Sequence, residues 1–399
     1  MNLFVKILLG FLGFVVLAGV GWWAASKVAA KPGPEAPPLS DLSDAGLQAA
    51  VESIAAERKL VGMAARVDVG GIVIAEAVTG LRRDDGSVPL SLDDLFHVGS
   101  IGKSMSATTI ATLVEDGLMG WDDTLGDSLE GVVEMHPGWT DTTLSQLLTH
   151  RAGIPQPPVT AMINSVSEPV RLREVRREVA ARILEEAPDT PPGSVFAYSN
   201  TGYMLASIMA EETTGESWET LIGTRLAAPM GLETLGFGAP TGGDENADVP
   251  WGHVRIGPVK LSMDPADNAD NPPWMAAAGT MHIGLDDLLA YGRAHLEAGR
   301  GPESVLSAAT FDYLHTPALD DYAHGWVVQR RDFGAGSEET VIWHNGSNTM
   351  WYAALFLVPE RDAVFALLTN DGSGLNGTQP RFDQLAKEII AALPRPDPG

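Results

Sequence analysis

The strongest constraint on the fold is the division of β-type sequence between the two ends of the chain. Near the start, two apolar runs flank Gly70-Gly71, a pattern typical of a β-hairpin. Near the end, three short runs are again rich in β-branched and aromatic residues, whereas residues 100–228 between them are mostly helical in pattern. The five predicted strands are 63–69, 72–78, 340–344, 351–358 and 363–369. We expect both β regions to join one antiparallel sheet.

The helical pattern recurs in several segments, so the expected fold class is α+β: an antiparallel sheet flanked by helices, plus a mostly helical second lobe. The predicted helices are 42–60, 103–116, 144–148, 172–186, 201–214, 285–298 and 379–393. Residues 236–275 are rich in Gly, Pro, Asp and Asn and are expected to be loops. The α/β lobe would comprise about 41–99 and 280–399, and the helical lobe about 100–279. A cleft between lobes is the usual place for a ligand site.

The first 26 residues form an apolar segment distinct from the folded part. Residues 7–25 are an uncharged run of 19 residues preceded by Lys6. As a helix this run would be about 28 Å long, close to the thickness of a bilayer's hydrocarbon core. The sequence therefore predicts an N-terminal apolar helix over 1–26, either a transmembrane anchor or a long signal peptide cleaved near residues 28–30. A Pro-rich linker, 27–40, and the main folded domain, 41–399, follow. We expect an exported protein, membrane-anchored or periplasmic or extracellular.

Composition excludes several classes of chemistry. The absence of cysteine rules out disulfides, thiolate catalysis and thiolate metal sites. The net charge of −26 repels nucleic acid, so no nucleic-acid partner is expected. The sequence contains no His-Glu-x-x-His, Walker A, Gly-x-Gly-x-x-Gly or Gly-x-Ser-x-Gly motif. We therefore expect neither a metal nor a cofactor.

Ser100 and Lys103 lie three residues apart at the predicted start of a helix. Residues at i and i+3 share one helix face, so the amine can reach the hydroxyl. Serine needs a base to become nucleophilic, and a lysine shielded from water has a depressed pKa that suits this role. Taken alone, the pattern is more often an N-capping serine followed by a surface lysine. Of the seven lysines, however, only Lys103 has serine three residues before it.

Two further elements lie downstream of this pair. Tyr198-Ser199-Asn200 precedes a predicted helix: a phenol beside a lysine can relay protons, and an amide can hold a substrate carbonyl, although Asn200 can equally cap the helix. His344-Asn345-Gly346 follows a predicted strand, which can present a backbone N–H and a cation-capable side chain to a cleft. His-x-Gly occurs four times in the chain, and a structural histidine is the alternative interpretation.

Taken in order, these elements resemble the serine β-lactamase-like family, which includes penicillin-binding D-alanyl-D-alanine carboxypeptidases, class C β-lactamases, D-aminopeptidases and related esterases. The resemblance runs from about Leu42 to Leu393. It includes Leu92–Ser100, Leu147–Pro155, Pro192-Gly193-Ser194 before Tyr198, and Ala278-Gly279-Thr280 before Asp286-Asp287-Leu288. It implies a β-lactamase/transpeptidase-like fold.

The resemblance also implies roles for the reacting groups. Ser100 would attack the substrate carbonyl and be acylated, and its backbone N–H and that of Ser347 would form the oxyanion hole. Lys103 and Tyr198 would share the general base and acid work, and which of them takes the first proton is left open. Asn200 would contact the substrate amide or position Lys103.

His344 and Gly346 would lie on the substrate-binding strand, and many relatives carry lysine where this chain has His344. A histidine is largely uncharged at pH 7, so it does not offer the permanent cation that a β-lactam carboxylate would meet. The resemblance therefore favours a serine hydrolase acting on an ester or on the amide of a D-amino-acid peptide, including substrates of cell-wall origin. A β-lactamase, or a non-catalytic binder of peptidoglycan or a partner protein, are the alternatives.

Overall fold

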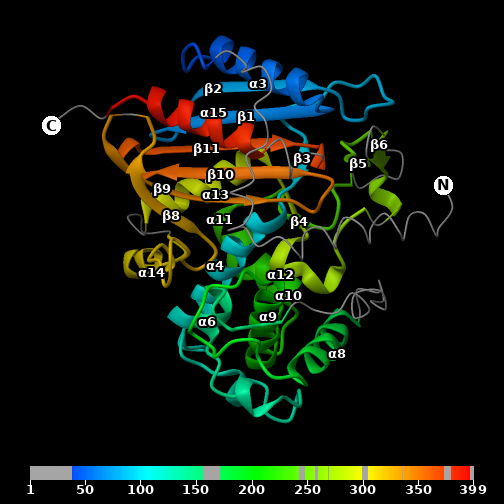
Figure 1. The fold of residues 1–399 in the computed structure, drawn as a ribbon, viewed down its shortest axis with the longest axis vertical. Helices are drawn as coiled ribbons and strands as arrows, with labels where there is room; N and C mark the ends of the chain where they lie inside the picture. The colour runs from blue at the N-terminus through cyan, green and yellow to red at the C-terminus, as the bar shows by residue number, and fades with distance from the viewer. Residues whose placement is uncertain are drawn as a thin grey trace.

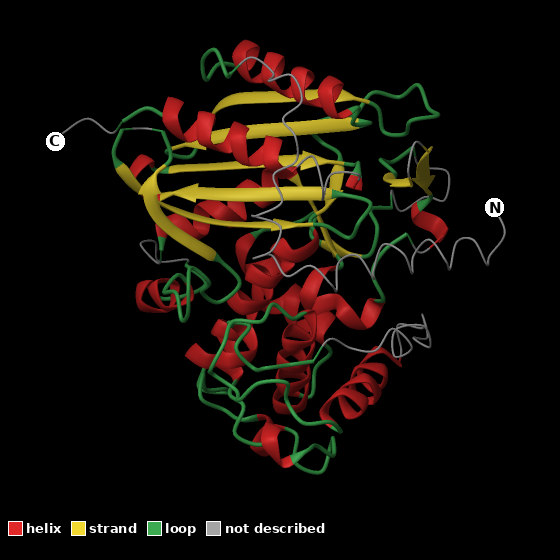
Figure 2. Cartoon of the chain, in the orientation of Figure 1, coloured by secondary structure: helices red, strands yellow, loops and turns green. Residues whose placement is uncertain are grey.

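The computed structural model describes residues 38–155, 171–241, 248–256, 259–267, 269–298, 304–334, 336–372 and 379–395. Its central feature is an antiparallel sheet of six strands in the order β2-β1-β11-β10-β9-β8 (Figures 1 and 2). The strands are β1 (Gly62–Val69), β2 (Ile72–Gly80), β8 (Val327–Asp332), β9 (Glu338–Gly346), β10 (Tyr352–Val358) and β11 (Ala363–Thr369). The predicted union of the two ends of the chain is confirmed, because β1 pairs with β11 from Met63↔Thr369 to Val69↔Ala363.

Both faces of the central strands β1, β10 and β11 are buried, and the two-residue period of a strand explains how. On β11, Phe365 and Leu367 pack with α3 and α15, whereas Val364 and Ala366 face the other side, where α13 lies. The three helices are α3 (Asp44–Arg58), α13 (Leu285–Glu297) and α15 (Gln379–Ala392) (Figure 1). Because neither face meets water, β10 and β11 are continuously apolar rather than alternating.

The helical lobe lies beside the α13 face of the sheet (Figure 1). Its helices are α4 (Gly102–Glu115), α5 (Leu125–Ser128), α6 (Leu144–Leu148), α8 (Leu172–Leu184), α9 (Asn200–Thr214), α10 (Trp218–Ile222), α11 (Ala228–Met230) and α12 (Ala276–Gly279). Helix α4 packs against α9, α10 and α12 and is buried along almost its whole length. A further short helix, α14 (Ala308–Leu314), also packs against α4.

The expectation that residues 236–275 are loops is wrong in part. A three-stranded sheet and a hairpin use this region: β3 (Leu95–His97) pairs with β7 (Met281–Gly284), which pairs with β4 (Gly236–Phe237), and β5 (Gly252–Ile256) pairs with β6 (Val259–Met263). These strands have only two to five residues; β3 and β4 pair with β7, which is distant in sequence, whereas β5 and β6 pair with each other. Local pattern therefore carries little signal for them.

The predicted apolar N-terminal helix and linker, up to residue 37, lie outside the described residues. In the part of the chain that the structure describes, no helix combines the length and the apolar character needed to cross a membrane.

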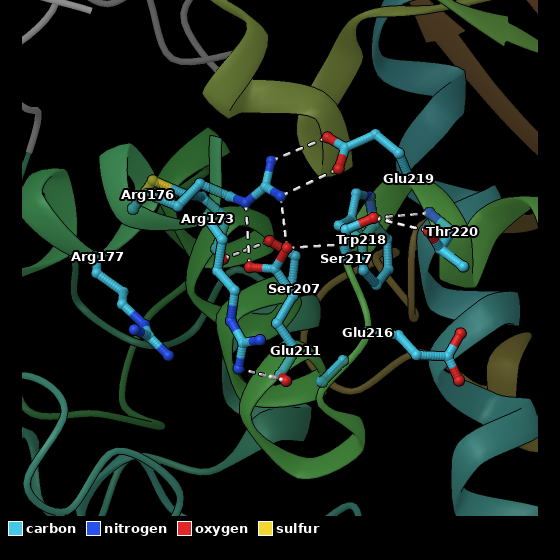
Figure 3. A network of polar contacts seen from close by, with 12 residues as sticks. Arg173, Arg176, Arg177, Ser207, Glu211, Glu216, Ser217, Trp218, Glu219 and Thr220 are labelled. Carbon is cyan, nitrogen blue, oxygen red and sulfur yellow. Dashed lines mark hydrogen bonds and ion pairs between the residues drawn. The ribbon is translucent and has the colours of Figure 1, made fainter. Parts of the chain in front are cut away.

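A buried ion network holds the helical lobe together (Figure 3). Arg176 of α8 is fully buried, and its Nε and Nη1 atoms donate to Glu211 Oε2 of α9 at 3.2 Å and to Glu219 Oε1 of α10 at 3.0 Å. The Glu211 carboxylate also accepts the backbone N–H of Trp218 at 2.9 Å. One guanidinium therefore ties three helices together, with its charge balanced inside the lobe.

Removing the charge of Glu211 should destabilise the lobe strongly. Glu211→Gln leaves the buried Arg176 cation short of a partner, and such losses cost about 3–5 kcal/mol of unfolding free energy. Glu216→Gln changes an exposed glutamate on the neighbouring turn and should cost less than about 0.5 kcal/mol. Chemical denaturation of both variants measures the difference. Equal midpoints would show that the network contributes nothing beyond a surface charge.

Candidate active site

The site is built where α4 begins, between the sheet and the helical lobe. Ser100 lies in a 3-10 turn, Gly99–Ile101, and Lys103 is the second residue of α4, so the two follow one helical path as the spacing predicts. The Lys103 Nζ atom lies 2.9 Å from Ser100 Oγ. It also donates to the backbone carbonyl of Ala278, on α12, at 2.5 Å.

Lys103 is completely buried, and this burial lowers its pKa well below the ordinary value of 10.5. No carboxylate is hydrogen-bonded to its amine, whose partners in the described residues are the Ser100 hydroxyl and the Ala278 carbonyl. The uncharged amine can keep one N–H on the Ala278 carbonyl while its lone pair accepts the proton of the Ser100 hydroxyl. The interpretation of Lys103 as a surface lysine is therefore wrong.

Tyr198 completes the group around the nucleophile. The centroid of its ring lies 5.0 Å from Lys103 Nζ, and its hydroxyl interacts with the Ser100 side chain. Burial raises the pKa of Tyr198, and the contact with Ser100 opposes the shift without cancelling it. The site thus pairs a phenol that holds its proton more tightly than a free tyrosine with an amine that releases its proton more readily than a free lysine.

Asn200 is the first residue of α9, whose N-cap position is Ser199 rather than Asn200. It is partly exposed, and it is not among the described hydrogen-bond partners of Lys103. The structure therefore gives no support to positioning of Lys103 by Asn200, and contact with the substrate amide stays a prediction.

Two glycines allow the predicted oxyanion donors to approach each other. Gly99 precedes Ser100, Gly346 precedes Ser347, and the two segments pack backbone against backbone. A Cβ atom at Gly99 would lie less than 3.0 Å from the Ser347 nitrogen, and one at Gly346 less than 3.0 Å from the Ser100 nitrogen. Gly99 also has a φ of +50°, in the left-handed region that favours glycine.

Polar side chains behind these segments fix their positions. His97 is fully buried, accepts the Gly99 backbone N–H on Nδ1 at 3.1 Å, and lies 2.8 Å from Asp270 Oδ1 through Nε2. Asn348 donates to the same carboxylate oxygen at 3.0 Å. The residue before Ser100 and the residue after Ser347 are thus joined through one aspartate.

His344 lies on β9 but is buried, with 3% of its surface exposed. Its Nε2 lies 3.1 Å from the Tyr322 hydroxyl and its Nδ1 2.5 Å from the Asn345 carbonyl oxygen. Burial, reinforced by the nearby Lys103, lowers the pKa of His344 to about 3, so the imidazole is uncharged at neutral pH. The predicted substrate-binding role of His344 stays a prediction.

Sequence reasoning missed Tyr322 and His150, which lie between the predicted elements. The His150 ring lies tilted against the Tyr198 ring, with the two centroids 4.1 Å apart, and its Nε2 lies 3.1 Å from the Tyr322 hydroxyl. His150 falls in the Leu147–Pro155 segment that carries part of the resemblance, so a signal existed for it; none existed for Tyr322. Among the described residues no cluster of three or more His, Asp or Glu side chains is arranged to hold a metal ion.

Comparison with known proteins agrees with this geometry. The model of the family described as Beta-lactamase matches residues 47–388, most of the chain. The chain belongs to the β-lactamase family. The resemblance stated from the three motifs is thereby confirmed, and so is the β-lactamase/transpeptidase-like α+β fold over the described residues.

Individual relatives of this β-lactamase-family chain are distant. Penicillin-binding protein 4 of Amycolatopsis lactamdurans is 26% identical over 356 residues, covering 86% of this chain and 88% of that protein. The D-aminopeptidase of Gluconobacter oxydans is 26% identical over 340 residues, covering 83% of this chain but 60% of the relative. The octameric penicillin-binding protein homologue from Pyrococcus abyssi superposes with a TM-score of 0.71 at 24% identity, covering 87% of this chain and 77% of that one.

Proposed function

We propose that this protein is a serine hydrolase that acts through a covalent acyl-enzyme at Ser100, on an ester or on the amide of a D-amino-acid peptide. The observation that carries the proposal is the buried Lys103 amine, 2.9 Å from Ser100 Oγ, with a pKa far below that of a free lysine. Such an amine is a competent general base at neutral pH. Similarity to a D-aminopeptidase supports the substrate class.

In the proposed reaction Lys103 takes the first proton. As Ser100 Oγ bonds to the substrate carbonyl carbon, its proton passes to the Lys103 amine, and the carbonyl oxygen becomes an oxyanion. The backbone N–H groups of Ser100 and Ser347 would stabilise that charge. Tyr198 would donate its phenolic proton to the leaving amine or alkoxide, because its raised pKa keeps the phenol protonated. Lys103 would return its proton to Tyr198.

Hydrolysis of the acyl-enzyme reverses these roles. A water molecule would lose a proton to the Lys103 amine as its oxygen attacks the acyl carbon. The Ser100 oxygen would leave as the acid product forms and would regain the proton. No group outside Ser100, Lys103, Tyr198 and the two N–H donors is needed for the atoms and charges to balance.

The uncharged His344 argues against β-lactamase activity as the main function. A buried imidazole with a pKa of about 3 supplies no cation for a β-lactam carboxylate near neutral pH. We therefore expect slow acylation by penicillins without rapid turnover. Fast hydrolysis of a chromogenic cephalosporin would favour the β-lactamase alternative.

Covalent labelling tests the proposal. A fluorophosphonate or a fluorescent penicillin should label the full-length protein once, and peptide mass mapping should place the adduct on Ser100. Ser100→Ala should lose the label. Ser104→Ala should keep it, because that buried hydroxyl donates to the Ile101 carbonyl at 2.8 Å, away from the lysine.

No adduct with either probe would reject the hydrolase assignment and favour a non-catalytic binder on the same fold. Label that persists in Ser100→Ala would place the nucleophile elsewhere. A panel of D- and L-amino-acid amides and simple esters, assayed on the same preparation, separates peptidase from esterase preference.

A further inference from the structure

The Tyr322 hydroxyl lies between two buried imidazoles that come from different parts of the site. One is His150, which follows α6 and contacts the Tyr198 ring; the other is His344 of β9, two residues before Gly346. Both Nε2 atoms are 3.1 Å from the Tyr322 oxygen. A single hydroxyl proton must therefore serve two nitrogen atoms, and the outer contacts of the two rings decide which nitrogen receives it.

The contact of His150 with the backbone fixes the first tautomer. The Ser199 N–H lies 3.1 Å from His150 Nδ1, and a backbone N–H can only donate, so Nδ1 carries no proton. Burial lowers the pKa of His150 well below 6.5, so the ring is uncharged. Its one proton is consequently on Nε2, which donates to Tyr322.

The contact of His344 with the backbone fixes the second tautomer. His344 Nδ1 lies 2.5 Å from the Asn345 carbonyl oxygen, which can only accept, so Nδ1 carries the proton of this uncharged ring. His344 Nε2 is then an acceptor and receives the proton of the Tyr322 hydroxyl. The direction of donation is the same throughout: Ser199 N–H to His150, His150 to Tyr322, Tyr322 to His344, and His344 to Asn345.

The Tyr203 hydroxyl is the competing acceptor for the proton of Tyr322. Tyr203 donates its own proton to the Leu148 carbonyl at 2.7 Å, so its oxygen is available only to accept. If Tyr322 donated there, an uncharged His344 would have to carry its proton on Nε2. Its Nδ1 lone pair would then face the Asn345 oxygen at 2.5 Å, and this repulsion excludes the arrangement.

We propose that Tyr322 is a positioning residue of the hydrolase site, whose hydroxyl links the Tyr198-Ser199-Asn200 segment to the His344-Asn345-Gly346 strand and holds both imidazoles in defined uncharged tautomers. This inference rests on the proposed function. It explains why the predicted site residues on the two lobes keep their relative position although Ser100 and Lys103 contact neither imidazole by a hydrogen bond in the described residues. It also explains why this position holds a histidine rather than a lysine. A lysine ammonium has no lone pair, so it could not accept the proton of the Tyr322 hydroxyl.

The groups facing this chain of contacts are few. Lys103 approaches from α4, Tyr198 and Tyr203 lie beside the His150 ring, and Phe196 packs on both His150 and Tyr322. Within the described part of the chain, no acidic side chain shifts the pKa of His150 or of His344. The two tautomers are therefore fixed by the direction of the hydrogen bonds rather than by ion pairs.

Nitrogen-15 NMR of the full-length protein labelled at histidine tests the tautomers without any turnover. At pH 7 we expect His344 as the Nδ1–H form and His150 as the Nε2–H form, with signals assigned from the loss of each in His344→Gln and His150→Gln. Finding the two rings in the same tautomer, or either ring doubly protonated, would overturn the proposal. The result stands whether or not Ser100 is acylated.

Kinetics test the positioning role. Tyr322→Phe removes one oxygen and keeps the ring, and we expect the rate of Ser100 acylation to fall at least about tenfold, with the His344 tautomer shifted. Tyr352→Phe is the matched control: Tyr352 is equally buried, and its hydroxyl accepts a hydrogen bond from Asn345 at 2.9 Å. It should stay within about twofold of the wild type.

The outcomes separate the two proposals. If the wild-type protein is not labelled at Ser100, the proposed function is rejected. The NMR tautomers of His150 and His344 then decide by themselves whether the hydrogen bonds through Tyr322 run as proposed. Normal labelling with equal rates in Tyr322→Phe and Tyr352→Phe rejects the positioning role while leaving the hydrolase assignment intact.

Discussion

Replacing Lys103 with methionine should abolish hydrolysis and, at the same time, change how stability depends on pH. Methionine fills nearly the same buried volume but offers no lone pair for the Ser100 proton. Loss of a general base costs about 10²–10⁴-fold in rate, and we expect kcat/KM for the best ester or amide to fall about 10³-fold. Steady-state assays on folded Lys103→Met and Lys387→Met, an exposed lysine of α15, measure the effect.

The stability effect follows from the lowered pKa of Lys103. The unfolded chain holds the lysine proton up to about pH 10.5, whereas the folded protein releases it at a much lower pH. Between these two pKa values the unfolded state binds more protons, so wild-type stability rises with pH. Lys103→Met lacks this linkage. The difference in unfolding free energy, variant minus wild type, should therefore grow as pH falls, by about 1.4 kcal/mol per pH unit.

Denaturant titrations at a series of pH values between 7 and 9 measure this slope. Its sign does not depend on the hydrogen bond to the Ala278 carbonyl that the variant also loses, because that loss shifts the whole curve by a constant. Lys387→Met should run parallel to the wild type. Parallel curves for Lys103→Met as well would mean that the lysine is charged in the folded protein and cannot be the base.

The sequence predicts those parts of the fold that are encoded locally. Helix Leu144–Leu148 and strand Ala363–Thr369 have the predicted bounds, and Gln379–Ala392 ends one residue early, because periodicity and capping residues act within a few positions. The β5–β6 hairpin escaped prediction because its support is remote. His253 donates its backbone N–H to the Met350 carbonyl and contacts the Asn370 carbonyl through Nδ1.

The same distinction separates the two halves of the site. Ser100 and Lys103 are three residues apart, so one helical turn is enough to predict their contact, which the structure contains at 2.9 Å. Tyr322 lies 172 residues from His150 in sequence and 22 from His344, and its position is set by the packing of its loop on α4. A tyrosine in an irregular segment has no local pattern that marks it. Side chains that join two lobes are visible only in the folded chain.

Substituting Gly346 with alanine should damage the oxyanion hole without removing any reacting side chain. The new methyl group would lie less than 3.0 Å from the Val98 carbonyl oxygen and from the Ser100 nitrogen, so the two segments must separate. Removing one oxyanion donor costs about 10²–10³-fold in kcat, and we expect a loss of that size, seen in kcat and kcat/KM alike. Gly223→Ala, where an added Cβ would have no neighbour within 4 Å, is the matched control and should be neutral.

Gly279→Ala provides a milder version of the same change. Its Cβ would lie 3.2 Å from the Gly99 carbonyl carbon and 3.5 Å from the Ser100 nitrogen. The Gly99 backbone would therefore have to move by only a few tenths of an ångström. If the close approach of the two N–H groups stabilises the transition state, the rate should fall in the order wild type, Gly279→Ala, Gly346→Ala, while thermal unfolding stays cooperative in the first two. Gly279→Ala and Gly346→Ala proteins that unfold cooperatively and turn over at the wild-type rate would show that the oxyanion is stabilised by other donors. In that case the backbone contact between Gly99 and Gly346 would serve the fold alone.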